Sequence, residues 1–526
     1  MRYFLGLLLP WLLFGQPLSL SYLKSKPRSI ERDFFIWQYL DQNITPIQAQ
    51  EALELVKNVN RKIFYRYALK IQNPKIIRIA ECSKIPFGKA LGEDANCLVI
   101  RLTPAGFLSL DRTMRQNVLK KISRYPLSKK LAPLATKSPF IALQDNPKEF
   151  LYFFNKVGTK NRQKYFNYEL SHKQLENLKK YWSFTNFIRK VVTEDLNNIG
   201  LDLLQLLPKD LTAEQNFLLG LYAYKYNFTQ RAKGFFDEAL ENYKSRRDKD
   251  KAAYWLYKLT HNKNYLHMIV NQKQLDIYNI LAHEKLSLPS NLYKYIQLHG
   301  KCSLAIKDPF VALQVYTKIK NGKDLDFLAK RSKNRECAGV YAIIQTKKSR
   351  FKDEYFVTPY EEYFKEQNVT RKILLYSLAR QESLFIPGSI SSSFALGPLQ
   401  FMPFLAKHTA KRLGIKNFRL MDMFDEKIAI TFANDHLNYL EAHLHHPLLI
   451  AYAYNAGIGF TARNILPQLQ MYEPLLVMEL NPSSQNRHYG KKVMENFWVY
   501  SKIFGYEFNL TDSLEKLDQH HHMQGF

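Results

Sequence analysis

The sequence predicts a mostly α-helical protein, in which an N-terminal α-helical superhelix (solenoid) is followed by a separate C-terminal domain. Glycine and proline are sparse, at 20 and 22 of 526 residues, which disfavours many short strands. Apolar residues recur at helical spacing through residues 30–350. The chain also exceeds the roughly 250 to 300 residues at which a single hydrophobic core stops growing, so we expect at least two domains.

The first two thirds of the chain consist of successive amphipathic helices joined by short polar connections. Residues 231–240 and 252–256 carry small and aromatic residues at the spacing of stacked helical hairpins. A compact all-helical domain is the alternative to a solenoid. The expected helices in this part include residues 34–39, 48–59, 217–224, 232–243 and 252–259.

A lysine-rich stretch at residues 322–351 and a turn near Pro359 indicate a change of unit before the C-terminal domain. Within that domain, residues 389–399 are rich in Ser, Gly and Pro, which predicts a loop or a short strand. The expected helices of the domain are residues 370–383, 403–413, 426–443, 448–454 and 489–504. The whole chain is expected to divide into a signal peptide (1–21), a superhelical domain (22–290), a helical linker domain (291–355), the C-terminal domain (356–510) and a flexible tail (511–526).

The formal net charge of +29 would attract nucleic acid, anionic lipid or an acidic polymer. The basic residues are spread along the whole chain, and the sequence contains no zinc-finger spacing, helix-turn-helix signature or basic zipper. We therefore expect no nucleic-acid partner.

The N-terminus predicts export. Arg2 precedes an apolar run at residues 4–14, and residues 19–21 have the small-x-small form of a signal-peptidase site. The run contains Pro10 and is shorter than the roughly 20 residues that span a bilayer, so cleavage is favoured over a retained membrane anchor. Periplasmic localisation follows from this prediction.

Four cysteines in an exported chain predict two disulfides. Their order suggests that Cys82 pairs with Cys97 and Cys302 with Cys337, although other pairings are compatible with the sequence. A metal site is disfavoured because there is no CxxC pair and no His at ligand spacing beside any of the four. We expect no metal and no cofactor.

Glu382 is the candidate catalytic residue. It lies four residues after Leu378, which lies four residues after Leu374, so the three side chains share one helix face. A carboxyl group that continues an apolar stripe is partly desolvated, and desolvation raises its pKa. A raised pKa suits a general acid, which must keep its proton near neutral pH.

Three further motifs follow Glu382-Ser383: Ser391, the segment Gly397-Pro398-Leu399-Gln400-Phe401-Met402-Pro403, and the segment Ala453-Tyr454-Asn455-Ala456-Gly457. In this order and spacing they resemble the motifs of the family 1 lytic transglycosylases, the soluble lytic murein transglycosylase group of glycoside hydrolase family 23. The resemblance covers about residues 365–505 and implies a lysozyme-like C-terminal domain. Upstream it is weaker, and residues 276–286 look like a helix of the family's superhelical domain.

The resemblance implies a reaction that needs one carboxylate. Glu382 would protonate the glycosidic oxygen, the substrate's acetamido group would stabilise the positive charge, and the ionised Glu382 would take the proton of the muramoyl 6-hydroxyl. The product would be a 1,6-anhydromuramoyl end. Ordinary glycosidases use two acids, and the sequence offers no convincing partner for Glu382. The implied substrate-binding residues are Ser391, Gln400, Met402, Tyr454, Asn455 and Tyr489.

The chain departs from the family pattern at several positions. Phe394 replaces a usual Gly, Pro398 and Leu399 replace Leu and Met, and Gln485 stands where the family has Glu. A hydrolytic lysozyme and a non-catalytic wall-binding scaffold are the rival functions. The expected partners are peptidoglycan glycan strands, with cell-wall synthesis proteins as further candidates, and the expected state is a monomer.

Overall fold

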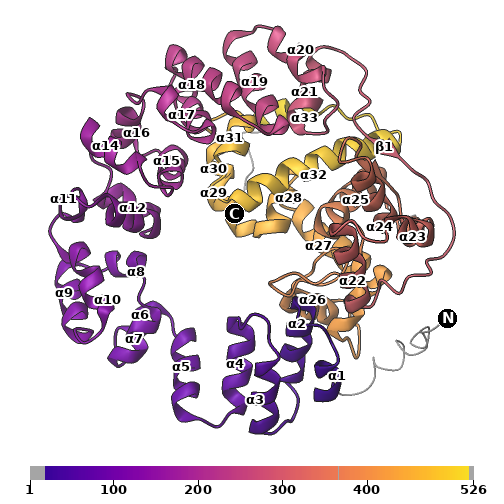
Figure 1. Cartoon of the computed structure of the whole chain (residues 1–526), viewed down its shortest axis with the longest axis horizontal. Coiled ribbons are helices and arrows are strands. Elements are labelled where there is room, and N and C mark those ends of the chain that lie inside the picture. Colours follow the sequence, from indigo (N-terminus) through magenta and orange to yellow (C-terminus); the bar gives the residue numbers. More distant parts are fainter. Residues whose placement is uncertain (1–17, 365–366, 520–526) are drawn as a thin grey trace. The chain divides into compact units, whose positions relative to one another are not determined.

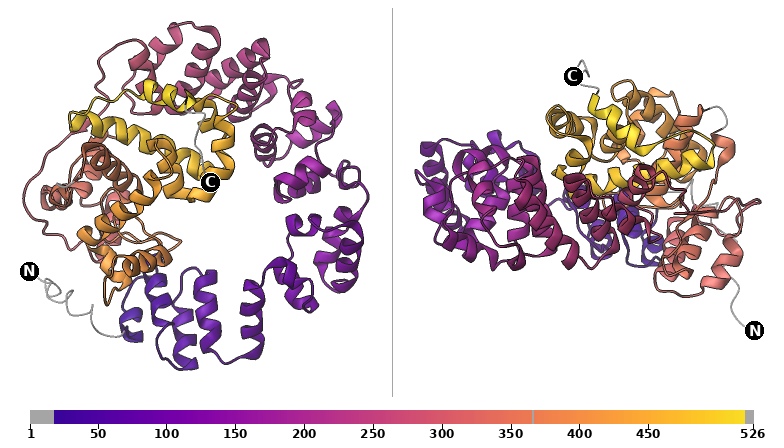
Figure 2. Two further views of the ribbon diagram at one scale, coloured as in Figure 1. Left: turned by 180° about the vertical axis from the view of Figure 1, so that it is seen from behind. Right: turned by 90° about the horizontal axis from the view of Figure 1, so that it is seen from above.

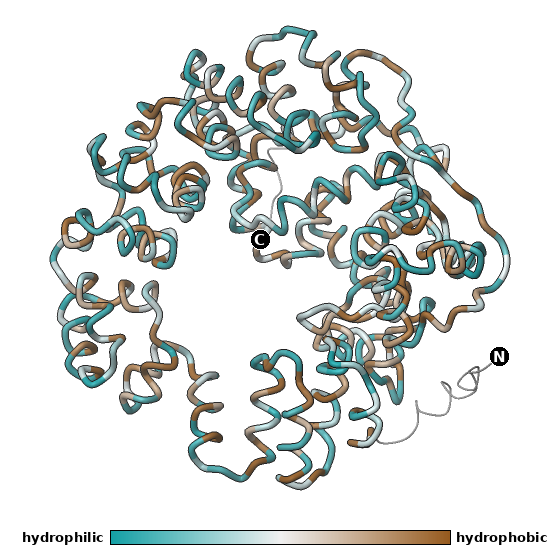
Figure 3. Tube along the Cα trace, in the orientation of Figure 1, coloured by the Kyte–Doolittle hydropathy of each residue, from teal (hydrophilic) through white to brown (hydrophobic). Residues whose placement is uncertain are grey.

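The computed structural model describes residues 18–364 and 367–519 and confirms a mostly α-helical fold. In these residues the regular strands are two short ones, β1 (Lys294–Tyr295) and β2 (Tyr355–Phe356), which pair in parallel. Brown and teal segments alternate along the helices in Figure 3, so the helices carry the amphipathic pattern expected from the sequence.

Contacts divide the chain into two compact units. The first contains residues 18–72, 272–478 and 483–519, and the second contains residues 73–271 and 479–482. The first helices of the chain therefore belong to the same unit as the C-terminal part. The domain boundaries expected from the sequence stay predictions.

The N-terminal helices of the first unit begin at polar capping residues. Thr45 forms a capping box with Gln48, and the side chain of Asn60 accepts hydrogen bonds from the backbone of Lys62 and Ile63. The helices are α1 (Leu20–Lys24), α2 (Ile30–Tyr39), α3 (Pro46–Glu54) and α4 (Arg61–Lys70).

The second unit is a row of short helices in which most helices pack against their neighbours in sequence, as in a solenoid (Figures 1 and 2). A disulfide joins Cys82 on α5 to Cys97 on α7. The elements are α5 (Pro74–Lys84), α6 (Phe87–Ala90), α7 (Ala95–Arg101), α8 (Pro104–Leu108), α9 (Arg112–Lys121), α10 (Pro126–Leu131), η2 (Ala132–Ala135), α11 (Pro139–Leu143), α12 (Pro147–Lys156), α13 (Thr159–Tyr165), α14 (His172–Lys179), α15 (Phe184–Thr193), α16 (Asn197–Leu203), η3 (Pro208–Asp210), α17 (Ala213–Lys225), α18 (Thr229–Asn242), α19 (Arg246–Thr260) and α20 (Asn264–Val270).

The rest of the first unit starts with α21 (Ile277–Lys285) and continues with a linker segment between β1 and β2. Its core contains Ile319, Leu328 and Ile344 together with Ile386 from outside the segment, and a disulfide joins Cys302 to Cys337. Both predicted cysteine pairings are thus confirmed. The helices here are α21 (Ile277–Lys285), which precedes β1, and α22 (Pro309–Lys320), α23 (Leu325–Ser332) and α24 (Ala338–Lys348), which lie between the strands.

The C-terminal helices pack around α32, which contacts both α25 and α28 (Figure 1). A side chain at Gly490 would place its Cβ 2.2 Å from the ring of Tyr452, so glycine is what lets α32 approach α28 so closely. The elements are η4 (Glu361–Tyr363), α25 (Val369–Ser383), α26 (Pro403–Arg412), η5 (Leu420–Phe424), α27 (Glu426–Glu441), α28 (Pro447–Ala456), α29 (Ile458–Asn464), α30 (Leu466–Leu469), α31 (Pro474–Leu480), α32 (Ser484–Ile503) and α33 (Leu510–Gln519).

Residues 511–519 of the expected flexible tail are helical, and residues 520–526 lie outside the described residues. Residues 510–519 form α33, and Leu510, Leu514 and Leu517 are buried. The carboxylate of Glu284 accepts hydrogen bonds from the backbone N–H groups of Leu510 and Thr511, at 2.9 and 2.8 Å. It thus caps the N-terminus of this helix, where backbone N–H groups have no partner within the helix.

Most of the expected signal peptide lies outside the described residues. Its last residues are described, and Leu20 begins α1. No helix in the part of the chain that the structure describes is long and apolar enough to cross a membrane.

Candidate active site

Glu382 lies in the last turn of α25, on the face predicted from the sequence. Leu374 and Leu378 on the same face are buried at 3% and 0% exposure, whereas Glu382 is half-buried. The helix ends directly after it, because Leu384 adopts a left-handed conformation with φ of 53°. The carboxyl group therefore stands at the end of an apolar stripe, with part of its surface open.

Tyr489 holds the carboxyl group. Its hydroxyl donates a 2.7 Å hydrogen bond to Oε1 of Glu382, and the tyrosine itself is 4% exposed. Burial and the nearby carboxylate raise the pKa of Tyr489 well above its ordinary value, so the phenol keeps its proton and stays a donor. Helix α32 thus fixes the orientation of a residue on α25.

Burial raises the pKa of Glu382 to about 7, and the hydrogen bond from Tyr489 acts in the opposite direction. Among the described residues, no second Asp or Glu contributes to this pKa. The site therefore contains one carboxyl group that is close to half-protonated near neutral pH. Such a group can both donate and accept a proton there.

Tyr454 lies close to this pair and bonds to the neighbouring loop. Its hydroxyl donates a 2.8 Å hydrogen bond to the carbonyl of Leu399, and burial, together with the charge of Glu382, raises its pKa. Ser383 binds the same loop, because its hydroxyl donates to the carbonyl of Pro398 at 2.8 Å. The loop is thus attached to the end of α25 and to α28.

The loop itself is a tight turn stabilised by its own polar groups. The hydroxyl of Ser391 accepts a hydrogen bond from the backbone of Ala395 at 2.9 Å, and Ile390 and Leu396 form an isolated β-bridge. Gln400 donates to the carbonyls of Ser389 and Gly397, at 3.2 and 2.7 Å. This agrees with the loop or short strand predicted for residues 389–399.

Met402 and Asn455 lie at the ends of two helices, α26 and α28. Met402 is the residue before α26, and Asn455 lies in the last turn of α28. The predicted residues that are half-buried, with part of each side chain accessible, are Glu382, Ser391, Gln400, Met402, Tyr454 and Asn455. The structure thus connects Glu382, Tyr489, Tyr454 and the Ser391–Gln400 loop, while the roles of these residues in substrate binding stay predictions.

Asn486 is a residue that the sequence analysis did not select. It is fully buried, and its Nδ2 donates to the carbonyl of Tyr452 at 3.0 Å and to Oδ1 of Asn455 at 3.4 Å. Asn486 stands three residues before Tyr489, so in a helix the two side chains share one face, and this spacing was the only sequence signal for Asn486. Gln485, which stands at the family's acidic position, is exposed in the first turn of α32.

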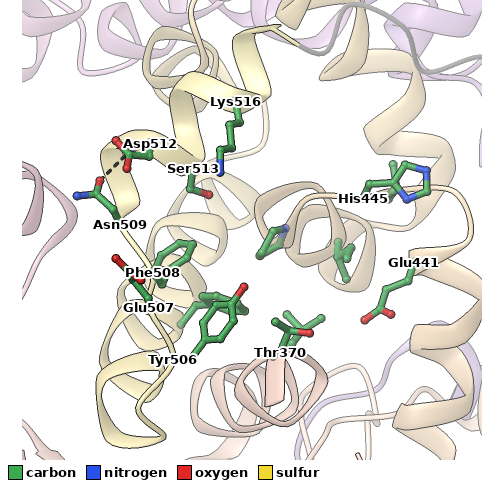
Figure 4. Close-up of a pocket in the computed structure, with 15 residues that line it drawn as sticks. Thr370, Glu441, His445, Tyr506, Glu507, Phe508, Asn509, Asp512, Ser513 and Lys516 are labelled. Carbon is green, nitrogen blue, oxygen red and sulfur yellow. Dashed lines mark hydrogen bonds between the residues drawn. The ribbon is translucent and has the colours of Figure 1, made fainter. Parts of the chain in front are cut away.

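A pocket of about 670 Å³ lies at the opposite end of α25, where Thr370 and Leu374 contribute to its lining (Figure 4). Thr370 and Glu382 are about 18 Å apart along the helix, given a rise of about 1.5 Å per residue. None of the predicted site residues lines this pocket. Its lining mixes Glu507 and Asp512 with Lys516 and therefore indicates no single class of ligand.

Comparisons with known proteins agree with the position of the site. Residues 360–468 match a family model described as the transglycosylase SLT domain. A putative soluble lytic murein transglycosylase from Haemophilus influenzae is 37% identical over 102 residues, which are 19% of this chain and 17% of that protein. The matched part thus spans about a sixth of that relative's length.

Two solved structures resemble the chain more broadly. The 70 kDa soluble lytic transglycosylase from Escherichia coli is 15% identical, with a TM-score of 0.47, over 93% of this chain and 83% of that one. An inactive mutant of the lytic transglycosylase Slt from Pseudomonas aeruginosa is 14% identical, with a TM-score of 0.47, over 93% and 84%.

Proposed function

We propose that this protein is a lytic transglycosylase that cleaves the glycan strands of peptidoglycan between N-acetylmuramic acid and N-acetylglucosamine. The observation that carries this proposal is the half-buried carboxyl group of Glu382, with a pKa of about 7, inside the segment that matches the transglycosylase SLT domain. The disulfides Cys82–Cys97 and Cys302–Cys337 support an exported, periplasmic enzyme, because such bonds persist in oxidising compartments.

In the proposed reaction Glu382 acts twice. Its protonated form gives a proton to the glycosidic oxygen, and the bond from that oxygen to the anomeric carbon of N-acetylmuramic acid breaks. The substrate's acetamido group stabilises the positive charge. The ionised Glu382 then takes the proton of the muramoyl 6-hydroxyl as its oxygen bonds to the anomeric carbon. No water is consumed, and Glu382 is protonated again.

The neighbouring residues support these two roles in different ways. Tyr489 orients the carboxyl group and stabilises its ionised form, since its hydroxyl donates to Oε1. Ser391 uses its oxygen as an acceptor inside the loop, which leaves its hydroxyl hydrogen for the acetamido group of the sugar. Gln400, Met402, Tyr454 and Asn455 would line the glycan-binding surface.

The substitution Glu382→Gln tests the proposal, because it keeps the shape of the side chain and removes the acid. We expect anhydromuropeptide release from purified sacculi to fall by at least about a hundredfold. Glu426→Gln is a matched control, since Glu426 is also a buried carboxyl group of this unit but pairs with Lys307. Per folded molecule, Glu426→Gln should keep the activity.

Product analysis in heavy-oxygen water separates the proposal from its rivals. A lytic transglycosylase leaves no heavy label at the muramoyl anomeric carbon, because the sugar's own hydroxyl closes the ring. Labelled, reducing muramoyl ends would show that water is the nucleophile and that the protein is a lysozyme. Binding of sacculi without release of any fragment would identify a non-catalytic scaffold.

A further inference from the structure

Phe394 occupies a backbone conformation that bulky residues avoid. Its φ is 65°, in the left-handed region, and it stands in the turn of the Ser391–Gln400 loop where its backbone N–H donates to the carbonyl of Ser391 at 2.8 Å. Glycine adopts this conformation without strain. A phenylalanine here therefore needs compensating contacts, and such strain persists only where the surroundings impose it.

The contacts come from the N-terminal helices of the same unit. The Phe394 ring is 1% exposed and lies 5.7 Å from the ring of Phe34 and 5.6 Å from the ring of Trp37, both on α2. The ammonium group of Lys62 on α4 lies 5.5 Å from the centre of the Phe394 ring. The same group donates a 2.7 Å hydrogen bond to the carbonyl of Ser393. Side chains more than 300 positions away in sequence thus hold the turn.

The holding side chains are themselves fixed. The guanidinium group of Arg66 lies 3.9 Å from the centre of the Trp37 ring and also donates to the Trp37 carbonyl. A further hydrogen bond of 2.9 Å joins Arg66 to Asp41. Trp37, which is half-buried, thus contacts both Arg66 and Phe394, and Arg66 holds the aromatic surface that it offers to the loop.

The loop connects this contact to the candidate active site. Phe394 lies three residues after Ser391, and the loop continues to the Leu399 carbonyl, which accepts the hydrogen bond of Tyr454. The loop is thus fixed at two places. Tyr454 and Ser383 hold its C-terminal part beside Glu382, and the Phe394 turn is held by α2 and α4.

We propose that Phe394 is a positioning residue through which α2 and α4 hold the Ser391 loop in the geometry that binds the glycan. This inference rests on the proposed function and adds a requirement to it: residues 30–70 serve the reaction without touching the substrate.

Two substitutions in the full-length protein test the role. Phe394→Gly removes the ring and relieves the backbone strain, whereas Trp37→Leu removes the aromatic surface and leaves the loop sequence intact. With soluble uncross-linked glycan strands, we expect each to lower kcat/KM for anhydromuropeptide release by about tenfold or more, because small displacements of a binding group have large effects. The loss should appear mainly as a higher KM. The pH dependence should stay unchanged, because Glu382 and Tyr489 are intact.

Phe35→Leu is the matched control for Trp37→Leu. Phe35 is also an aromatic residue of α2, but its ring stacks on Phe310 of α22 at 5.3 Å. Among the described rings, it meets Phe394 only through Phe34, which lies 5.5 Å away from it. We expect this variant to retain wild-type kcat/KM below its unfolding temperature. The double variant Trp37→Leu/Phe394→Gly should be no slower than the slower single variant, because both changes remove one shared contact.

Three results would overturn the inference: wild-type kcat/KM in Phe394→Gly, equal losses in Phe35→Leu and Trp37→Leu, or additive losses in the double variant. If Phe394→Gly does not fold, the comparison of Trp37→Leu with Phe35→Leu tests the positioning role instead. A wild-type protein that releases no anhydromuropeptides contradicts the proposed function itself. An active wild type with unaffected variants contradicts the positioning role alone.

Discussion

Replacing Tyr489 by Phe should move the pH dependence of the reaction upward. The tyrosine hydroxyl donates a 2.7 Å hydrogen bond to Glu382, and this bond favours the ionised form of the carboxyl group. It therefore keeps the pKa of Glu382 below the value that burial alone would set. Phenylalanine keeps the ring and its packing and removes only the donor.

The size of the shift follows from the strength of the lost bond. A hydrogen bond to a charged group contributes about 1.5 to 3 kcal/mol, and one pKa unit corresponds to about 1.4 kcal/mol. The pKa of Glu382, about 7 in the wild type, should rise by about one to two units in Tyr489→Phe. The alkaline limb of kcat/KM, which reports loss of the acid form, should move by the same amount.

The assay is the initial rate of anhydromuropeptide release between about pH 5 and pH 10, at substrate concentrations below KM. Tyr454→Phe is the control, because the Tyr454 hydroxyl donates to the Leu399 carbonyl and not to Glu382. We expect a lower rate in this control with no shift of the limb. An unshifted limb in Tyr489→Phe, or equal shifts in both variants, would refute the reasoning.

Three further predictions concern stability. Since the pKa of Glu382 in the folded state, about 7, lies above its ordinary value of 4.5, the wild type loses stability as the pH rises through this interval. At pH 8 the free energy of unfolding of Glu382→Gln should therefore exceed that of the wild type by up to about 3 kcal/mol, with little difference at pH 4. Urea unfolding at both pH values measures this difference. Equal differences at both pH values would contradict this. Replacing Cys82 and Cys97 together by Ser opens a loop with a sequence separation of 15 and should lower the free energy of unfolding by about 3 kcal/mol. Proteolysis between α5 and α7 should then be faster than in the wild type. Unchanged proteolysis would show that this bond stabilises little. Gly397→Ala should destabilise the protein by at least about 1 to 3 kcal/mol, because φ is +78° and the new Cβ would lie 2.1 Å from the Met423 carbonyl oxygen. If this variant had the same thermal unfolding midpoint as the wild type, the predicted steric clash would be contradicted.

Local sequence patterns predicted the features that depend on local spacing. The four-residue spacing of Leu374, Leu378 and Glu382 predicted one apolar helix face, and the structure has that face. The order of the cysteines predicted both disulfides, because each pair closes a short loop within one stretch of chain. These features require only helical geometry and short-range closure.

Contacts between residues far apart in the sequence could not be predicted from local spacing. The sequence showed that Phe394 is unusual, but the partner ring of Trp37 lies far away in the chain and nothing in the spacing indicates it. Helix α33 is a different case. The spacing of Leu510, Leu514 and Leu517 by four and three residues is a helical pattern that was present and was overlooked. Its N-terminal cap, Glu284, could not be found from the sequence.

The pairing of β1 with β2 has a consequence for how this chain can change in evolution. Lys294 pairs with Tyr355 and Tyr295 with Phe356, so the segment from α22 to α24 leaves and re-enters the fold at one place. A segment whose ends meet can be lengthened, shortened or exchanged without moving the elements outside it. Its disulfide and most of its core residues lie within the segment, and Ile386 and Phe35 pack against it from outside. We expect related chains to vary in length here more than between α25 and α32, where α25 carries Glu382, α28 carries Tyr454 and α32 carries Tyr489.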